Sequence, residues 1–458
     1  MAGKKKQAQL TPEEKLQQAL VPEDEQPYKV PANWCWTKLG NVCRFESGFA
    51  FKSDYFNKVN GIPVVRISDI KENEVILHNC IFTTELNIDE KFIIRNGDLL
   101  IAMSGATTGK NGIFKSDKIA YLNQRVGNIK VINNNVIKEL YRNYYIMNKS
   151  EEILKAAYGG AQPNISSSKI SSMFFPLPPL AEQQRIVERI ESLFAKLDEA
   201  KENLQNVLDG FETRKAAILH KAFTGELTAN WRKQHGVSMD SWEEKRLGEV
   251  CKINPSKINT KNLSDDLEVS FFPMASLSEI TGEIVGPEIR TLGKVKNDYT
   301  NFSEGDVVFA KITPCMENGK SAIIGKLING IGYGTTEFYV LRCGEELSNK
   351  YLHHIVRSKK FRDEAKHHMT GAVGQQRVPK KYMKEYMLNL PTLDEQTEII
   401  SIIDELLAKE QQAKELAENA ITKIDIIKKS ILARAFRGEL GTNNLADEPA
   451  AELLKRML

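Results

Sequence analysis

Two glycine–lysine stretches come closest to a nucleotide-binding motif. Residues 104–111 have the sequence SGATTGKN, and residues 315–321 have the sequence CMENGKS. A phosphate-binding P-loop needs the pattern GxxxxGK[ST], in which backbone N–H groups surround the phosphates and the hydroxyl binds magnesium. In the first stretch the glycines are one residue too close and an asparagine follows the lysine, and in the second Pro314 stands where the first glycine belongs. Both stretches are therefore predicted to be glycine-rich turns between strands.

Polar side chains that suit a nucleic acid gather in these turns and in other glycine-rich or basic stretches. Lys, Arg and small hydroxyls contact phosphates, whereas Arg, Lys, Asn and Gln match the edges of guanine and adenine. The alternative is that these are ordinary solvated loops. The first candidates for contact are Gln162, Asn164, Ser168, Lys169, Arg357, Lys360, Gln375, Gln376, Arg377, Lys380 and Lys381. The second candidates are Ser104, Thr107, Thr108, Lys110, Asn123, Gln124, Arg125, Lys311, Thr313, Asn318, Lys320, Thr335 and Thr336.

The composition is that of a globular protein with little net charge. The 458 residues are 41% hydrophobic and carry a formal charge of +3, too small to indicate a nucleic-acid binder by itself. None of the six cysteines belongs to a CxxC pair, so we expect reduced thiols. No run reaches the roughly 18 apolar residues of a membrane-spanning helix, and the lysine-rich start lacks the apolar stretch of a secretory signal. These features predict a soluble, cytoplasmic protein.

One long segment occurs twice. Residues 178–227 align with residues 391–440 without a gap and share roughly 20 identities in about 50 positions, which indicates an internal duplication. Glu-Gln stands near the start of both copies and Gly-Glu-Leu ends both. The preceding blocks match more loosely, with Trp34 aligned on Trp242. The chain therefore consists of two halves, each a variable block followed by a matched segment.

The matched segments are predicted to be long helices. Their apolar residues recur at alternating steps of three and four, which is the spacing of a coiled-coil seam. One such helix cannot bury its seam alone, so the two copies are expected to pack together as a coiled coil. The order block, helix, block, helix closes compactly if the helices are antiparallel and the blocks sit at opposite ends. Gly210 is expected to bend the first helix.

Each variable block is predicted to be an α+β domain. Short β-rich runs at 61–70, 97–103, 305–312 and 336–343 are bounded by turn residues, whereas residues 137–157 and 349–368 have helical patterns. At the two chain ends, the stretches 11–20 and 446–458 predict short helices. Thr11 caps the first of them. These end helices are expected to pair and close the pseudo-twofold repeat.

On these motifs the chain resembles the specificity (S) subunit of a Type I restriction–modification system. The resemblance rests on the duplicated starts PLPPLAEQQRIV and NLPTLDEQTEII, on the ends AFTGEL and AFRGEL, and on the GDLL and GDVV strands. It covers nearly the whole chain. It implies two α+β target-recognition domains that each bind one half of a bipartite double-stranded DNA sequence. The long antiparallel helices separate them and set the spacer, and the unlike loops of the two blocks predict an asymmetric target.

The resemblance also implies partners, and no catalytic centre in this chain. Two methyltransferase (M) subunits dock on the helices and methylate adenine at N6, and restriction (R) subunits join through them. S-adenosylmethionine, ATP and Mg are expected in those partners, with no cofactor or metal here. The residues agree, since neither 176–180 nor 254–257 completes the Asn/Asp-Pro-Pro-aromatic loop of an adenine methyltransferase. The histidine pairs 353–354 and 367–368 lack a metal-ligand constellation and are predicted to be solvated or to face phosphates.

The predicted organisation alternates domains and helical spacers. It comprises an N-terminal extension (1–30), a first target-recognition domain (31–178), a first spacer (179–228), a second target-recognition domain (229–391), a second spacer (392–440) and a C-terminal tail (441–458). Partner docking is expected at Glu182, Gln183, Arg185, Phe223, Glu395, Gln396 and Phe436. For the two Glu-Gln pairs, capping of the helix N-terminus is an equal alternative.

Other interpretations of the same features stay open. The chain could serve a modification-only methyltransferase complex or act as the DNA-binding scaffold of another defence assembly. An enzyme with an unrecognised site is disfavoured, because paired acid–base and metal motifs are missing from the sequence. A purely structural coiled coil is disfavoured by the two large variable blocks.

Helix length should set the spacing of the two half-sites. Deleting one heptad from each spacer removes roughly 10 Å of helical rise, so the preferred DNA spacer is expected to shorten. Mapping the methylated motif of the shortened variant checks this, and a motif with an unchanged spacer would refute it.

Overall fold

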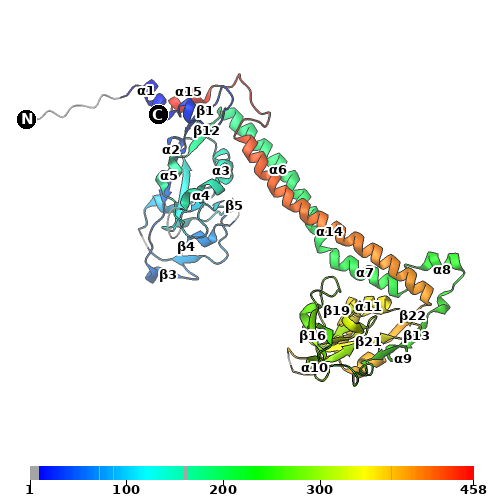
Figure 1. Ribbon diagram of the computed structural model, residues 1–458. Coiled ribbons are helices and arrows are strands. Elements are labelled where there is room, and N and C mark those ends of the chain that lie inside the picture. Colours follow the sequence, from blue (N-terminus) through cyan, green and yellow to red (C-terminus); the bar gives the residue numbers. More distant parts are fainter. Residues whose placement is uncertain (1–9, 72, 86, 159–162, 373) are drawn as a thin grey trace, which may run out of the picture. The chain divides into compact units, whose positions relative to one another are not determined.

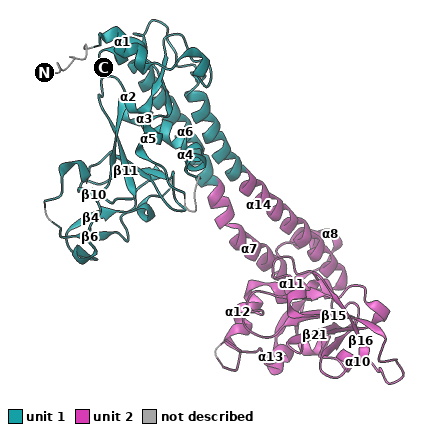
Figure 2. Ribbon diagram, turned by 60° about the vertical axis from the view of Figure 1, so that its left-hand side comes forward, with its two compact units in different colours: residues 1–203, 420–458 teal, residues 204–419 magenta. Residues whose placement is uncertain are grey.

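The computed structural model describes residues 10–71, 73–85, 87–158, 163–372 and 374–458. The chain divides into two compact units: unit 1 contains residues 1–203 and 420–458, and unit 2 contains residues 204–419 (Figure 2). Each unit joins one α+β domain to one part of each duplicated segment (Figure 1). The limits of the compact units therefore fall inside the predicted helical spacers.

The duplicated segments form long helices, and only the first is interrupted. The first copy contains α6 (Leu180–Asp209) and α7 (Phe211–Phe223), whereas the second copy is one helix, α14 (Leu393–Ala435). Gly210 separates α6 from α7, and the aligned position in α14 is Lys423. Glycine costs about 1 kcal/mol more than alanine inside a helix. The expected bend is thus a short break at the glycine.

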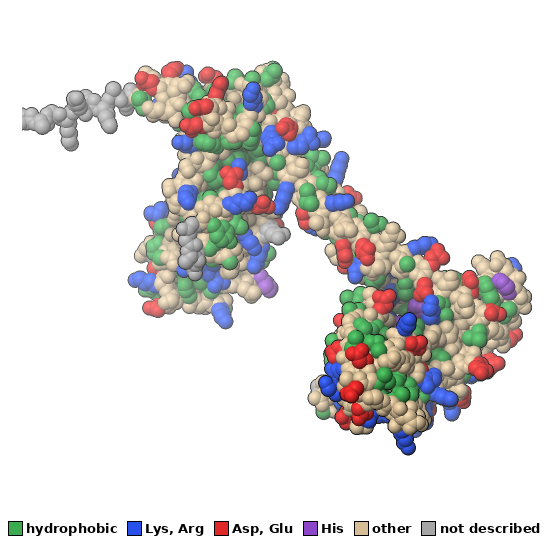
Figure 3. All heavy atoms as spheres, viewed as in Figure 1, with side chains coloured by type: hydrophobic (Ala, Val, Ile, Leu, Met, Phe, Trp, Pro, Cys, Tyr) green, Lys and Arg blue, Asp and Glu red, His purple; other side chains and the backbone are tan. Residues whose placement is uncertain are grey.

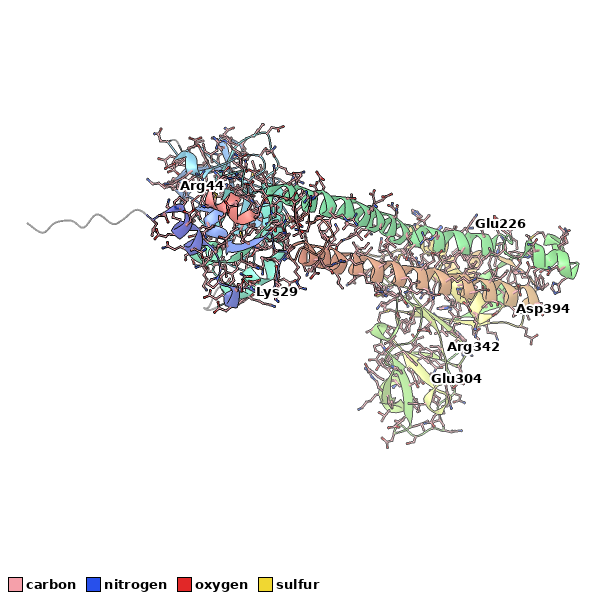
Figure 4. The ribbon with its side chains drawn as sticks, turned by 90° about the horizontal axis from the view of Figure 1, so that it is seen from above. Lys29, Arg44, Glu226, Glu304, Arg342 and Asp394 are labelled. Atoms are coloured by element: carbon pink, nitrogen blue, oxygen red, sulfur yellow. The ribbon has the colours of Figure 1, made fainter. Side chains whose placement is uncertain are left out.

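The helices are antiparallel inside each unit, as predicted. In unit 1, Lys201 Nζ lies 2.9 Å from a carboxylate oxygen of Asp425 on α14, and Asp198, one turn earlier on α6, pairs with Lys428, one turn later. In unit 2, the ion pair between Arg214 of α7 and Glu410 of α14 measures 2.8 Å. Figure 4 shows Glu226, just after α7, and Asp394, in the first turn of α14, at the same end of unit 2.

The α+β domain of unit 1 is built on two mostly antiparallel sheets and a two-stranded ribbon. The described strands have the orders β3-β6-β4-β10-β7, β2-β11-β8-β9-β5 and β1-β12. They are β1 (Cys35–Lys38), β2 (Cys43–Ser47), β3 (Phe56–Asn57), β4 (Ile62–Val65), β5 (Asn73–Glu74), β6 (Ile81–Thr83), β7 (Ile93–Ile94), β8 (Leu99–Ala102), β9 (Asn111–Ile113), β10 (Ala120–Leu122), β11 (Val126–Val131) and β12 (Phe174–Leu177). All four residues of β8 are buried, which agrees with its apolar sequence LLIA.

The α+β domain of unit 2 repeats this topology with fewer strands. Its described strands have the orders β16-β15-β20-β17, β14-β21-β18-β19 and β13-β22. They are β13 (Glu243–Arg246), β14 (Cys251–Ile253), β15 (Glu268–Phe272), β16 (Glu288–Thr291), β17 (Thr300–Phe302), β18 (Val307–Ala310), β19 (Ser321–Ile323), β20 (Gly332–Gly334), β21 (Phe338–Cys343) and β22 (Met387–Leu390). The central strand β18 is fully buried like β8, so the two domains are copies of one fold and the predicted repeat is confirmed.

Short helices cover the sheets. The predicted helices 137–157 and 349–368 each divide in two, giving α3 (Glu139–Asn148) with α4 (Ser150–Ala157), and α11 (Asn349–Arg357) with α12 (Lys359–His367). Ser358 ends α11 because its hydroxyl accepts from the backbone N–H of Phe361 and caps α12. The other helices are α2 (Leu39–Val42), α5 (Ser167–Ser171), α8 (Ala229–His235), α9 (Leu247–Val250), α10 (Leu292–Val295) and α13 (Lys380–Glu385).

The two chain ends meet in unit 1, as predicted. Helix α1 (Pro12–Ala19) begins with a capping box in which Thr11 and Glu14 bond each other's backbone N–H groups. Helix α15 (Ala450–Lys455) packs against it. Lys455 pairs with Glu13, and Lys15 Nζ donates to the carbonyl of Leu458 at 2.7 Å. The tail therefore completes the core of the first domain.

The surface mixes charges of both signs. On the face in Figure 3, Lys and Arg side chains alternate with Asp and Glu side chains over both units, which fits the formal charge of +3. Among the described residues, no helix combines the length and apolar character needed to cross a bilayer.

Candidate nucleic-acid interface

Three loops of unit 2 meet at one edge of its domain. They are residues 311–320 between β18 and β19, residues 335–337 between β20 and β21, and residues 370–372 with 374–378 between α12 and α13. Backbone hydrogen bonds of 2.9–3.0 Å join them: Lys311 N to the carbonyl of Glu337, Val378 N to that of Lys311, and Thr313 N to that of Gln376. We call this joined set the three-loop surface of unit 2.

Unit 1 has an equivalent three-loop surface. Residues 103–110 lie between β8 and β9, residues 123–125 between β10 and β11, and residues 163–165 follow α4. The joining bonds are the same: Met103 N to Arg125 O, Ile165 N to Met103 O, and Gly105 N to Pro163 O, all at 2.9–3.0 Å. The loops 104–110 and 315–320 are turns between strands, as predicted. Nine candidates of the first block and nine of the second belong to these loops or stand beside them in the sequence, and this pairing brings most of them together.

In unit 1 the surface presents long polar side chains to solvent. Lys110, Gln124, Arg125 and Asn164 are exposed, whereas Ser104, Thr107 and Asn123 are partly buried beside them. The prediction that Thr108 contacts DNA is wrong. Its side chain is buried, and its hydroxyl donates to the carbonyls of Gly105 at 2.7 Å and Pro163 at 3.2 Å. It holds two loops together and offers nothing to a ligand. Gln162 lies outside the described residues.

In unit 2 the cations of the surface are held by their neighbours. The Arg377 guanidinium donates to both oxygens of Glu337 at 2.8 and 2.9 Å, and this bond holds the pKa of Glu337 below its usual range. Lys311 Nζ donates to the carbonyl of Thr336 at 2.8 Å, and burial lowers the pKa of Lys311. Gln375 is exposed. A planar guanidinium fixed on two oxygens has a defined direction, which suits the reading of a base edge.

Further candidates on these loops have local roles. The Thr313 hydroxyl accepts from the backbone N–H of Gln376 at 3.1 Å, and Asn318 Nδ2 donates to Glu279 at 3.1 Å. Lys320 Nζ makes a long 3.5 Å contact with the carbonyl of Met274. The Thr335 hydroxyl accepts from the N–H of Glu337. These contacts shape the loops.

Six candidates lie on helices and not on the three loops. Lys360 and Lys381 are exposed and line a cavity of about 730 Å³ beside Phe223. Arg357 ends α11 and donates through Nη2 to the carbonyls of Glu279 at 3.3 Å and Ile280 at 2.9 Å, and its contact with DNA stays a prediction. The remaining three are exposed on short helices: Ser168 and Lys169 on α5, and Lys380 on α13.

A buried Glu-Gln pair fixes the domain of unit 1 to α6. Glu182 accepts from Trp34 Nε1 at 2.7 Å, just before β1. Gln183 Oε1 accepts from the backbone N–H of Lys138 at 2.8 Å, where α3 begins, and its Nε2 donates to the carbonyl of Pro178 at 3.0 Å, after β12. Both side chains are completely buried. We call this pair the unit 1 latch.

The same device occurs in unit 2. Glu395 accepts from Trp242 Nε1 at 2.9 Å, just before β13. Gln396 Oε1 accepts from the backbone N–H of Ser348 at 2.8 Å, where α11 begins, and its Nε2 donates to the carbonyl of Pro391 at 2.9 Å. Both side chains are again completely buried. Burial of polar groups is tolerated because each of these groups finds a hydrogen-bond partner. This pair is the unit 2 latch.

The two latches differ in the charge of the group that bonds the glutamate. Glu395 forms an ion pair with Arg232 Nη1 at 2.5 Å, and the Arg232 side chain is only 9% exposed. Glu182 instead accepts from Asn443 Nδ2 at 2.6 Å. The unit 2 latch is therefore a buried charge pair, whereas the described partners of the unit 1 glutamate are uncharged.

The latches correct the predicted partner-docking residues. Glu182, Gln183, Glu395 and Gln396 neither cap their helices nor reach the surface, because their side chains bind the adjacent domain. Phe436 is buried too, with ring centroids 5.3 Å from Tyr141 and 5.4 Å from Tyr145. The equivalent Phe223 is half-buried against Tyr351. Arg185 pairs with Asp447 and donates to the carbonyl of Thr442.

Two features of the site were not predicted from the sequence. Glu337, the partner of Arg377, was passed over beside Thr335 and Thr336, although Arg125 stands at the equivalent place in the other repeat. That reversal of charge between the repeats was the available signal. The sequence showed that the two tryptophans align with each other. Their hydrogen bonds to the Glu-Gln pairs could not be predicted, because these bonds depend on the tertiary fold.

Comparison with known proteins places the chain among DNA specificity subunits. The family model for the Type I restriction modification DNA specificity domain matches residues 31–209 and again 239–421. The chain is 34% identical over 260 residues to the Type I restriction enzyme EcoEI specificity subunit of Escherichia coli, a match that covers 48% of the chain and 43% of that relative. It is 24% identical to the StySPI specificity subunit of Salmonella potsdam, covering 92% of each. The chain thus spans less than half of the first relative and nearly all of the second.

Solved structures share the fold. An HsdS subunit from Thermoanaerobacter tengcongensis superposes with a TM-score of 0.60 at 20% identity, covering 91% of this chain and all of the other. A chain from a study of complex assembly and conformational transition of the type I R-M system superposes with a TM-score of 0.65 at 18% identity, covering 90% of this chain and all of the other.

Removal of the charge from each latch should have unequal effects. Glu395→Gln leaves Arg232 as a buried, unpaired cation, which costs about 3–5 kcal/mol. Glu182→Gln leaves no unpaired charge behind, because the described partners of Glu182 are uncharged donors, and the mismatched hydrogen bond should cost about 1–3 kcal/mol. The free energy of local opening, from native-state hydrogen exchange at the first turns of α14 and α6, measures both. Equal losses in the two variants would contradict the assigned ion pair.

Proposed function

The chain belongs to the family of Type I restriction modification DNA specificity domains, and from this premise we propose that it is the DNA-recognition subunit of a Type I restriction–modification complex. Each α+β domain binds one half of a split, asymmetric double-stranded target through its three-loop surface. The chain itself carries no catalytic centre, and the chemistry is performed by partner subunits.

One observation carries this proposal: two equivalent surfaces share their backbone frame and differ in their side chains. The joining hydrogen bonds are the same in both units, yet Arg125 of unit 1 stands where unit 2 has Glu337, and Asn164 stands where unit 2 has Arg377. A protein that binds two unlike half-sites needs this combination. The frame places each surface alike, and the side chains supply different hydrogen-bond patterns to the bases.

The side chains assign roles within each surface. Arg125 and Arg377 read guanine, because a guanidinium matches the O6 and N7 acceptors of guanine. Gln124, Asn164 and Gln375 supply amides suited to adenine. Lys110, Lys320 and the loop hydroxyls other than that of Thr108 contact phosphates and set the register. Glu337 orients Arg377 and thereby narrows the range of DNA half-sites that unit 2 binds.

The partners follow from the family and from the repeat. Two M subunits dock on the helices, one per repeat, and methylate adenine at N6, and R subunits join through them. The latches are unavailable, so docking uses the outer helix faces, where Leu416 and Ile426 of α14 are each 62% exposed and Val207 of α6 is 39% exposed. S-adenosylmethionine, ATP and Mg bind in those partners, and the complex acts in the cytoplasm. The small net charge fits a subunit whose partners share the neutralisation of the DNA.

The proposed function is tested by methylation mapping. Genomic DNA is compared between cells that express the chain with its neighbouring M subunit and cells that lack only the chain. Adenine methylation at one split motif, present only with the chain, is the expected result. Identical maps would contradict a role in DNA specificity.

The two arginines should act on separate halves of the motif. Arg125→Ala should relax the half read by unit 1 and Arg377→Ala the half read by unit 2, each at about 1–3 kcal/mol of discrimination. Methylation frequencies over single-base variants of the motif measure this. The exposed Lys233 on α8 provides the control, since Lys233→Ala should leave both halves unchanged. An equal effect of either arginine variant on both halves would overturn the assignment.

A further inference from the structure

A cavity of unit 2 contains buried nitrogen atoms that the fold does not use. It has a volume of about 750 Å³ and lies between α7, α11, α14 and the turn 280–284. His353 Nε2 and Arg357 Nη1 are buried at its wall and have no hydrogen-bond partner within the described part of the chain. They are one helical turn apart on α11. Buried polar nitrogens without partners are costly, so such a pair calls for an external group.

A third nitrogen group belongs to the same wall. Lys215 of α7 lines the cavity, and burial lowers its pKa. Apart from Glu212, the charges that act on Lys215 are cations: Arg357, Arg362 and Lys414. These groups raise the local potential, and a bound anion would relieve the repulsion between them.

The equivalent place in unit 1 is closed by its own side chains. The ring of Phe194 packs edge-on against Tyr144 with centroids 6.0 Å apart, and Lys428 Nζ lies 5.0 Å from the Phe194 centroid. Lys428 is also paired with Asp198. The aligned residues of unit 2 are Leu407 for Phe194 and Lys215 for Lys428, and Asp198 is replaced by a neutral glutamine, Gln411. Unit 2 therefore lacks the aromatic ring that fills this space in unit 1, and it lacks the carboxylate that pairs with the lysine there.

Carboxylates also line the cavity, and most of them are engaged. Asp404 is bonded by His354 Nε2 at 3.1 Å, and Glu415 accepts from Gln411 Nε2 at 2.8 Å. Glu283 interacts electrostatically with Arg357. The engaged carboxylates lie on α14, whereas the unused nitrogens lie on α11, so the anion-accepting part of the cavity is its α11 wall together with Lys215.

From these observations we propose that unit 2 contains a phosphoryl-binding site formed by Lys215, His353 and Arg357. A phosphoryl group offers several acceptor oxygens and a charge that Arg and Lys complement. The site is separate from the three-loop surface and does not depend on the proposed base recognition. The phosphoryl group belongs to a free phosphate compound or to a DNA backbone, and the test separates these sources.

The pKa of His353 reports phosphoryl binding, because phosphate would not change this pKa if His353 only supported the fold. Burial, with Arg357 and His354, lowers its pKa to about 3, opposed by Asp404 and by a hydrogen bond with the backbone of Ser321. The histidine is therefore neutral at neutral pH. A phosphoryl group beside Nε2 favours the protonated ring and must raise this pKa.

The experiment titrates the full-length chain with inorganic phosphate at constant ionic strength. The His353 side-chain NMR signal and the unfolding temperature are recorded for the unaltered chain, Lys215→Met and Lys428→Met. Phosphate should raise the His353 pKa and the unfolding temperature of the unaltered chain and of Lys428→Met, because binding to the native state stabilises it. Lys215→Met should weaken phosphate binding by at least about tenfold.

A second arm measures DNA binding by the same proteins. If phosphate competes with a duplex and Lys215→Met weakens both, the phosphoryl group is that of the DNA backbone. If only phosphate binding falls, the site takes a free phosphate compound. The proposal is wrong if phosphate leaves the His353 signal unmoved, or if Lys428→Met loses as much affinity as Lys215→Met. These results leave the methylation map unaffected, so they do not decide the proposed function.

Discussion

A carboxylate and an amide, buried together at the start of each long helix, fix the α+β domain of each unit to that helix. The glutamate receives the indole N–H of the tryptophan before the first strand, and the glutamine receives the N–H at the start of a domain helix. Hydrogen bonds to a buried charge contribute about 1.5–3 kcal/mol each, and loss of one partner leaves the other exposed to the full cost of burial. The domain therefore cannot tilt on its helix without breaking several bonds together.

This constraint explains how the two domains can diverge without losing their placement. The latch glutamines bind backbone groups, so most sequence changes inside the domain leave those bonds intact. The three loops are likewise joined through backbone atoms, at Met103 and Arg125 in one unit and at Lys311 and Glu337 in the other. Side chains on the loops are free to vary, and the two surfaces have opposite charges at one equivalent position. The cavity of unit 2 is a second place where side chains differ between the repeats although the helices that carry them correspond.

The sequence predicted the architecture well because periodicity and duplication report local structure. The apolar steps of three and four predicted α14, and the break at Gly210 followed from the weak helical propensity of glycine. The capped helix at Thr11 was also correct. The latches were misjudged because Glu and Gln near a helix start are typical of caps, and only the tertiary fold places Trp34 and Trp242 against them. Residue type indicated the loops of the site, but their joining, the burial of Thr108 and the bonds of Arg357 to Glu279 and Ile280 depend on contacts between distant segments.

The most direct test of the account exchanges the two domains inside their latches. In such a chain, residues 39–173 and 247–386 trade places, while both two-stranded ribbons, both Glu-Gln pairs and the long helices α6, α7 and α14 remain. Folding and assembly with the M subunit are checked first, and the methylated motif is then mapped. The account predicts an unchanged split motif, because each domain carries its own reading surface, the latches bind its backbone, and domains exchanged within a pseudo-twofold repeat read the same two half-sites on the opposite strands. A motif with altered half-sites, or a folded and assembled chain that directs no methylation, would contradict it.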